Sequence, residues 1–441
     1  MTETADKKTS PPGREPRRAA FEVMRQVLRQ GQGLETAIAG SPRWQQLPAR
    51  DKAFARHVVA TVLRRLGQID AAIAACLDKP LKGKLNAVQD LLRLGAAQVL
   101  FMEVATHAAV GETVELATGV RVGPHKSLLN AVLRRLSREG SDLLAAQDVA
   151  RLNTPAWLWS RWTRAYGETA VRAMAAQHLR EPPLDIAVVD PATRDTWAER
   201  LDATVLPTGT LRLSAGTGDI RRLPGYDDGA WWVQDAAASL PARLLGDVAG
   251  REVVDLCAAP GGKTAQLVAA GANVLAVDRS TDRLQQLVGN LERLSLAAAT
   301  VVAEVQDWTP PTQPSAVLLD APCTATGTVR RHPDIARLKR PEDVPLMADL
   351  QAELLHAAAE ILAPGGTLVY AVCSLEPEEG PERVASLLAG RDDMWIVPVS
   401  SAEIGGLEAA ITADGELRTL PHHLAEQGGM DGFYACRLQK R

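Results

Sequence analysis

The sequence predicts a parallel, doubly wound α/β domain in the C-terminal half, preceded by an all-α domain and a small α+β connecting domain. Three observations support this fold class: apolar residues recur at helical spacing over 19–140, tryptophan is enriched over 141–240, and short apolar runs alternate with helical stretches over 241–441. The first 18 residues are polar and proline-bearing, so we expect a disordered arm over 1–18.

The segment 19–140 carries apolar stripes that fit helices of period 3.6. One stripe consists of Phe54, Val58, Val59, Val62, Leu63 and Leu66. A second stripe runs from Leu128 to Leu136, with basic residues near its end that we interpret as a solvated face.

The connecting segment 141–240 contains six of the nine tryptophans, and the alternation over 183–189 predicts a strand. Aromatic side chains beside basic ones can stack on unpaired bases. Trp157 and Trp162 also suit helix packing, and we favour packing because large aromatic side chains dominate protein cores.

The segment 241–441 alternates predicted strands and helices, which indicates βαβ units and a parallel sheet. The predicted strands are 252–256, 273–278, 300–303, 316–320 and 366–373, the predicted helices are 263–270, 281–294 and 348–362, and two late strands are expected at 394–397 and 433–438. A sheet of seven strands is therefore expected.

Composition excludes several classes of protein. The chain has 441 residues and a formal charge of −4, which argues against a histone-like polycation. Its five cysteines are an odd number without a CxxC pair, so neither a disulfide framework nor a four-cysteine zinc site is expected. No apolar run is long enough to span a membrane. We expect a cytoplasmic monomer with no metal and no membrane partner.

A glycine-rich turn follows the strand predicted at 252–256. A phosphate-binding Walker loop requires glycine at position 257, where this chain has Cys257, and the dinucleotide spacing Gly-x-Gly-x-x-Gly is absent as well. The small residues that remain let a ligand lie against the backbone at the carboxyl end of this strand. They are Ala258, Ala259, Gly261 and Gly262.

Two aspartates lie where the next strands end. Asp278 ends the second strand, where a carboxylate can accept hydrogen bonds from both ribose hydroxyls, and Asp307 follows the third strand, within reach of an adenine edge. A nucleoside without phosphates fits this pattern better than NAD or ATP.

Two cysteines lie at the ends of later strands. Cys323 follows the strand at 316–320, and Cys373 ends the strand at 366–373. Neighbouring strands are about 4.8 Å apart, so both thiols can face one crevice at the ligand-binding edge of the sheet. Cys76 and Cys436 are interpreted as ordinary core residues.

The strings DLCAAPGGKT, DAPCTATG followed by VRRHPDI, and YAVCSLEPEE resemble motifs of the RsmB (Sun) branch of the RNA 5-methylcytosine methyltransferases. GAWWVQD at 229–235 and GMDGFY at 429–434 resemble that family too, and the helical N-terminal domain is similar to the antitermination factor NusB. The resemblance implies a Rossmann-like S-adenosylmethionine-dependent methyltransferase domain after a NusB-like RNA-binding domain. The implied substrate is a cytosine of small-subunit (16S) ribosomal RNA.

The resemblance also implies roles for residues. Cys373 would be the nucleophile, and Cys323 would assist product release. The cofactor would be contacted by Cys257, Ala258, Ala259, Pro260, Gly261, Gly262, Lys263, Asp278, Asp307 and Asp320. The chain departs from the family pattern at residues 324–327, where Ser-Gly-Thr-Gly is common, and at Gly380, where Asn is common.

Chemistry explains why two thiols and a carboxyl group would be required. Carbon 5 of cytosine is a weak nucleophile, so a thiolate, Cys373, first adds to carbon 6. Asp320 would stabilise the charge that develops at ring nitrogen 3. After methyl transfer a base, Cys323 directly or through water, would accept the proton from carbon 5.

A basic segment follows Cys323. It contains Arg330, Arg331, Arg337, Lys339 and Arg340 against the single acidic residue Asp334, and we expect it to contact RNA phosphates. Two alternatives stay open: the same chemistry on transfer RNA, or a non-catalytic RNA-binding antitermination-type factor.

Overall fold

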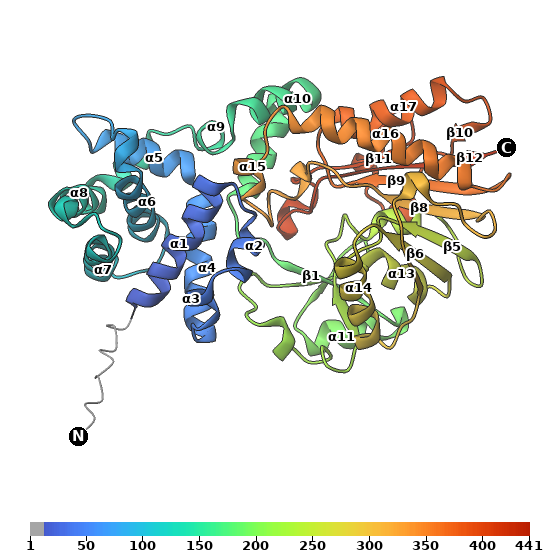
Figure 1. Cartoon of the computed structure of the whole chain (residues 1–441), viewed down its shortest axis with the longest axis horizontal. Helices are drawn as coiled ribbons and strands as arrows, with labels where there is room; N and C mark the ends of the chain where they lie inside the picture. The colour runs from blue at the N-terminus through green and yellow to red at the C-terminus, as the bar shows by residue number, and fades with distance from the viewer. Residues whose placement is uncertain (1–12) are drawn as a thin grey trace. The chain divides into compact units, whose positions relative to one another are not determined.

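A computed structural model describes residues 13–441 and divides them into two compact units (Figure 1). The first unit contains the chain up to Trp159 together with His332–Leu338, and the second contains Ser160–Arg331 and Lys339–Arg441. The predicted arm lies outside the described residues over 1–12. Its boundary at residue 18 is wrong, because helix α1 already begins at Arg14.

The first unit is all helical, as the apolar stripes predict. Its longer helices bury one face each, and Val58, Val59, Val62 and Leu63 of α4 are fully buried in the shared core. The helices are α1 (Arg14–Gln30), α2 (Leu34–Ala39), α3 (Pro42–Gln45), α4 (Ala49–Arg64), α5 (Leu66–Ala75), α6 (Asn86–Phe101), α7 (Thr106–Gly119), α8 (Lys126–Ala145) and α9 (Val149–Asn153).

The segment His332–Leu338, which includes α15 (Ile335–Leu338), belongs to this helical unit. The carboxylate of Asp334 accepts a hydrogen bond from the backbone N–H of Leu34 at the start of α2, at 2.9 Å. The Arg337 guanidinium donates to the carbonyls of Leu63 (3.2 Å) and Asn153 (2.7 Å), and burial lowers its pKa to about 10. The segment His332–Leu338, which follows Cys323 in the chain, is therefore part of the helical unit.

The second unit begins within α10 (Ala156–His178), which bends at Gly167, and continues into a four-stranded antiparallel sheet of order β2-β3-β1-β4. The bounds of its elements are β1 (Leu184–Val188), α11 (Arg194–Arg200), β2 (Thr204–Val205), β3 (Leu211–Leu213) and β4 (Trp231–Val233). Trp231 packs on one face of this sheet, and Trp232 packs on the other against the α/β core. These tryptophans are core residues and offer no stacking platform to a base.

The larger sheet has the order β10-β12-β9-β8-β5-β6-β7. Its bounds are β5 (Glu252–Leu256), β6 (Asn273–Asp278), β7 (Ala299–Val302), β8 (Ala316–Asp320), β9 (Thr367–Val372), β10 (Met394–Ile396), β11 (Leu417–Thr419) and β12 (Phe433–Lys440). Strands β5 to β9 run parallel, while β12 pairs antiparallel with β9, β10 and β11. The eighth strand, β11, is the one that the sequence prediction lacked.

Helices cover both faces of this sheet (Figure 1). Short α12 (Leu240–Arg243), α13 (Gly262–Ala269) and α14 (Thr281–Arg293) pack on one face, and α16 (Asp343–Ile361) and α17 (Pro381–Ala389) pack on the other. Alternation along β8 assigns Leu318 to the first face and Val317 and Leu319 to the second. The parallel strands therefore end together at one edge, where loops can form a site.

Within residues 13–441, no helix is both long and apolar enough to cross a membrane.

Candidate active site

The turn after β5 brings the backbone close to the edge of the sheet. Cys257 adopts a left-handed conformation (φ 58°), and Gly261 adopts φ 97°, where an added Cβ would lie 2.7 Å from Leu287 Cγ. The backbone N–H of Ala258 donates to the carbonyl of Val277 in β6 at 3.1 Å. The glycine at 261 is therefore required by both backbone conformation and space.

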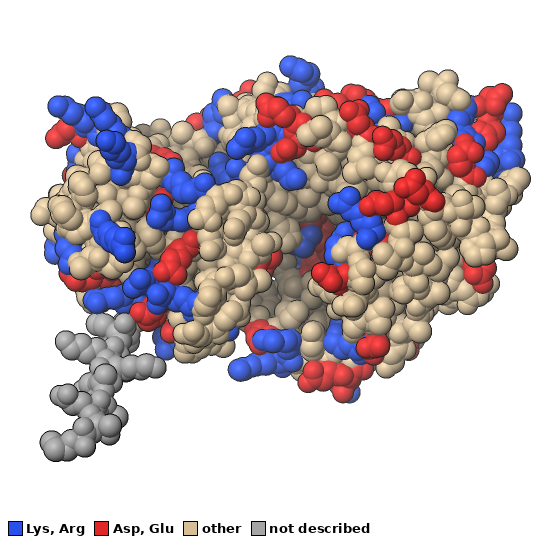
Figure 2. Space-filling model, in the orientation of Figure 1, with Lys and Arg blue, Asp and Glu red and all other residues tan. Residues whose placement is uncertain are grey.

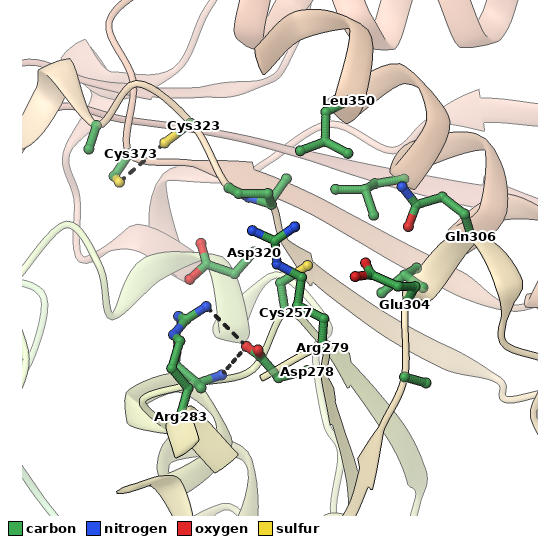
Figure 3. Close-up of a pocket in the computed structure, with 17 residues that line it drawn as sticks. Cys257, Asp278, Arg279, Arg283, Glu304, Gln306, Asp320, Cys323, Leu350 and Cys373 are labelled. Atoms are coloured by element: carbon green, nitrogen blue, oxygen red, sulfur yellow. Dashed lines mark hydrogen bonds and ion pairs between the residues drawn. The ribbon is translucent and has the colours of Figure 1, made fainter. Parts of the chain in front are cut away.

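Asp278, at the end of β6, is 2% exposed and has both carboxylate oxygens oriented by neighbours. Oδ2 accepts from the backbone N–H of Ala259 (3.2 Å) and pairs with Arg283 (3.3 Å), and Oδ1 accepts from the N–H of Ser280 (3.1 Å). Figure 3 shows the ion pair between Asp278 and Arg283 at one end of a cavity. A carboxylate fixed in this position can accept ribose hydroxyls.

Asp320 and Lys263 form an ion pair at the centre of the same edge. Lys263 Nζ donates to Asp320 Oδ2 at 2.7 Å and lies 5.0 Å from the centre of the Phe433 ring. Lys263 is 8% exposed, while the Asp320 side chain is 33% exposed and lines the cavity. The lysine therefore orients a carboxyl group that faces the ligand space.

The two thiols predicted to share a crevice are in direct contact. Cys323 Sγ and Cys373 Sγ lie 3.4 Å apart, and both line the cavity (Figure 3). The hydrogen bond with Cys373, burial and nearby negative charge raise the pKa of Cys323 well above its usual value. Burial raises the pKa of Cys257 to about 12, so that third cysteine is a thiol at neutral pH.

One cavity joins the turn, the aspartates and the thiols. Its empty volume, including the open mouth, is about 810 Å³. Asp278 and Glu304 face one part of it, with Val305, Leu350 and Leu354 as apolar walls. Carboxylates that can accept hydrogen bonds from hydroxyls, beside apolar walls, fit the adenosine part of S-adenosylmethionine. Asp320 lies between this part of the cavity and the two thiols (Figure 3).

The structure corrects the prediction for Asp307. Asp307 ends the 3₁₀ turn Val305–Asp307, is exposed and does not line the cavity. Glu304, two residues after the end of β7, lines it instead. The signal that could identify Glu304 is the one that identifies Asp278, an acidic residue where a parallel strand ends.

Arg330 does not form part of the solvent-facing stripe that the sequence predicted, whereas the side chain of Arg331 is 33% exposed. Arg330 is 1% exposed and pairs with Asp235 and Asp431, which are themselves buried. Arg331 binds Asp431 at 2.7 Å through Nε. Burial opposes the charge of Arg331, but these carboxylates raise its pKa. Since Arg330 has no surface to offer RNA, its predicted phosphate contact is corrected to a structural ion pair.

The other three basic residues of the segment differ in their surroundings. The Arg337 guanidinium donates to carbonyls inside the helical unit, so its predicted phosphate contact is corrected to a structural role. Lys339 is half-buried and Arg340 is exposed, so both side chains reach solvent. Among the residues that the structure describes, no group of three or more His, Cys, Asp or Glu is arranged to hold a metal ion.

The fold and site define a class of protein: an α/β methyltransferase domain that follows a NusB-like helical domain. The family described as "16S rRNA methyltransferase RsmB/F" matches residues 242–439, and the NusB family matches residues 14–138. The chain is 36% identical to the Ribosomal RNA small subunit methyltransferase B of Escherichia coli O157:H7 over 440 residues, covering 96% of this chain and 98% of that one. A relative of the same name from Cronobacter sakazakii is 35% identical over 442 residues, with the same coverage.

The chain therefore belongs to the RsmB/F family of 16S rRNA methyltransferases, whose cofactor is S-adenosylmethionine. Solved structures agree on the fold. The structure titled PH0851 has a TM-score of 0.75 at 21% identity, covering 98% of this chain and all of the other. NSun6 from Pyrococcus horikoshii with SFG has a TM-score of 0.54 at 18% identity, covering 65% of this chain and 98% of the other.

Proposed function

We propose that the protein methylates carbon 5 of one cytosine in 16S ribosomal RNA through a covalent intermediate with Cys373. The observation that carries this proposal is the contact of two thiols, 3.4 Å apart, in the cavity that also contains the Asp278 and Asp320 carboxylates. One methyl-transfer site with two thiols fits a reaction that needs a nucleophile and a separate proton acceptor.

Cys373 is the nucleophile in this proposal. Its sulfur adds to carbon 6 of the ring, which makes carbon 5 electron-rich, and the carbon–sulfur bond breaks again when the carbon 5 proton leaves. Cys323 lies within reach to accept that proton, directly or through water. Because the pKa of Cys323 is raised, this residue is a thiol at neutral pH and must lose its own proton before it can act as that base.

Asp320, which Lys263 holds in place, stabilises the cytosine ring at its nitrogen 3. S-adenosylmethionine supplies the methyl group on its sulfonium when bound. Asp278 and Glu304 hold the ribose and adenine, and the turn is shaped to pass close to the ligand. The turn residues are Cys257, Ala258, Ala259, Pro260, Gly261, Gly262 and Lys263.

RNA binding depends on local cations in this proposal. Figure 2 shows Lys and Arg side chains interspersed with Asp and Glu over the visible face, in line with the net charge of −4. Lys339 and Arg340 are the members of the basic segment that contact phosphates. The target cytosine must be unstacked to reach the cavity. A monomer acting without a metal remains our expectation.

Transfer of tritium from labelled S-adenosylmethionine to undermethylated 16S ribosomal RNA tests the proposal, with transfer RNA as the comparison substrate. We expect label in one cytosine that becomes resistant to bisulfite. Cys373→Ala should abolish incorporation while leaving the Kd for S-adenosylmethionine within about twofold, since the thiol contributes little to a multi-contact cofactor site. Incorporation at another base, or turnover by Cys373→Ala above about 1% of wild type, would overturn it.

A further inference from the structure

We propose that Glu379 is a positioning residue that sets the distance between the two thiols by binding the residue after each of them. This inference rests on the proposed function, because the spacing matters only if both thiols act on one base. Glu379 follows β9 in the 3₁₀ turn Pro377–Glu379 and is fully buried.

The sheet alone does not place the two sulfur atoms. The pairing of β8 with β9 ends with Asp320 opposite Ala371, and Cys323 lies three residues beyond that point. A backbone bond from the N–H of Gly327 to the carbonyl of Cys373, at 3.0 Å, joins the two loops farther on. The short contact between the thiols therefore depends on what holds the loops in between.

The Glu379 carboxylate holds the two loops together. Its Oε2 accepts from the backbone N–H of Thr324 (2.8 Å) and from Gln351 Nε2 (3.0 Å). Its Oε1 accepts from the hydroxyls of Ser374 (2.9 Å) and Thr324. Thr324 follows Cys323 and Ser374 follows Cys373 in the chain, so one carboxylate binds both thiol loops.

Two further contacts make this arrangement rigid. Gln351, from α16, also donates to the carbonyl of Pro322 at 2.8 Å, so both neighbours of Cys323 are bound. The Tyr370 hydroxyl donates to the backbone carbonyl of Glu379 at 2.6 Å. Glu379, Thr324, Ser374 and Gln351 are all 0% exposed, which excludes water as a competing partner.

The donor types predict how two substitutions differ. Glu379→Gln keeps one oxygen for the Thr324 N–H and Gln351, and its amide can donate to the two hydroxyls, because a hydroxyl can accept as well as donate. Glu379→Ala removes all four hydrogen bonds and leaves the loops untied. Loss of these bonds in Glu379→Ala should therefore disturb the spacing of the thiols, whereas the bonds without the charge in Glu379→Gln should maintain it.

The rate of disulfide formation between Cys323 and Cys373 measures their spacing without RNA or cofactor. Diamide takes two electrons and two protons from the two thiols as one S–S bond forms, and thiol counting with peptide mass mapping follows the reaction. We expect Glu379→Ala to slow it at least tenfold and Glu379→Gln less than threefold. In methylation assays, kcat of Glu379→Ala should fall about 100-fold, the cost of an ångström-scale misplacement, with KM for S-adenosylmethionine within twofold.

Glu416→Ala is the matched control, since Glu416 is a buried glutamate that binds the Tyr434 hydroxyl and neither thiol loop. It should change thermal stability but not the disulfide rate or kcat. Ser374→Ala, which removes one small hydroxyl, should slow the disulfide about threefold and keeps the test decisive if Glu379→Ala does not fold.

Folded Glu379→Ala with a disulfide rate and kcat within twofold of wild type would overturn the inference. An unchanged rate of disulfide formation in Ser374→Ala would also overturn the inference. Failure of the wild type to methylate RNA would overturn the proposed function but not the spacing role, which the disulfide rate reports separately.

Discussion

Arg330 offers the sharpest test of how the structure uses its charges. The guanidinium is 1% exposed and faces Asp235 and Asp431, which are 5% and 0% exposed, with an additional bond to the carbonyl of Gly428 at 3.4 Å. Arg330→Met keeps a long apolar side chain but removes the cation. It leaves two buried carboxylates to share Arg331.

The expected loss of stability follows from this geometry. Removing one partner of a buried ion pair costs about 3–5 kcal/mol. Arg331 still binds Asp431 at 2.7 Å, so we expect the lower end, about 3 kcal/mol. With an m value of about 3 kcal/mol/M, the urea midpoint should fall by roughly 1 M.

The loss should also depend on pH. Burial opposes ionisation of Asp235, but Arg330 and Arg331 hold its pKa below the usual value, so this stability is present above the unfolded pKa and is lost as pH falls through the folded pKa. In Arg330→Met, burial without that cation raises the pKa of Asp235. Protonation of Asp235 then removes the buried, unpaired charge from the variant. The difference in the free energy of unfolding between variant and wild type should therefore shrink as the pH falls from neutral to mildly acidic.

Urea unfolding of the full chain at several pH values measures both effects. Arg340→Met is the matched control, since the same change at an exposed arginine should alter stability by less than about 0.5 kcal/mol. It should instead weaken RNA binding and reduce its salt dependence. The reasoning is refuted if Arg330→Met unfolds like wild type and loses RNA affinity.

Three other predictions concern the thiol, the cofactor and the helical unit. Cys323→Ala should accumulate a protein–RNA adduct that survives denaturing gels, because elimination is slowed; a variant that turns over without adduct would remove Cys323 from product release. Asp278→Asn should weaken the calorimetric Kd for S-adenosylmethionine about 10- to 100-fold, since a charged hydrogen bond contributes about 1.5–3 kcal/mol, and a change below twofold would contradict its ribose role. Arg337→Ala should destabilise the helical unit by about 2–4 kcal/mol in urea unfolding, because two buried carbonyls lose their donor; unchanged unfolding would show that these bonds contribute nothing.

Local pattern was sufficient where one segment determines its own structure. The apolar runs that end at Leu256 and Asp278 gave strands β5 and β6 with their bounds, and the glycine at 261 marked the turn that it shapes. That Cys323 and Cys373 line one cavity was also predictable, because parallel neighbouring strands end at the same edge, whereas their direct contact depends on the loops beyond the strands.

Predictions failed where a residue's role depends on distant partners. Arg330 looked like part of a charged surface because Asp235 and Asp431 lie 95 and 101 residues away in the chain. Arg337 is half-buried and donates to two carbonyls of the helical unit, which no local pattern shows. Glu379 was missed for the same reason, since its donors come from Thr324, Gln351 and Ser374.

The short strand β11 was missed for a different reason. It has only three residues, Leu417–Thr419, too few for an alternating pattern, and it forms because β12 offers it a partner.

The most direct test of the covalent mechanism uses 16S ribosomal RNA in which cytidine is replaced by 5-fluorocytidine. Fluorine at carbon 5 cannot leave as a proton does, so the adduct cannot be resolved after methyl transfer. Peptide mass mapping of the trapped complex should then place the methylated pyrimidine on Cys373, and only when S-adenosylmethionine is present. A pyrimidine attached to Cys323, or inhibition without any covalent adduct, would contradict the assignment of Cys373 as nucleophile.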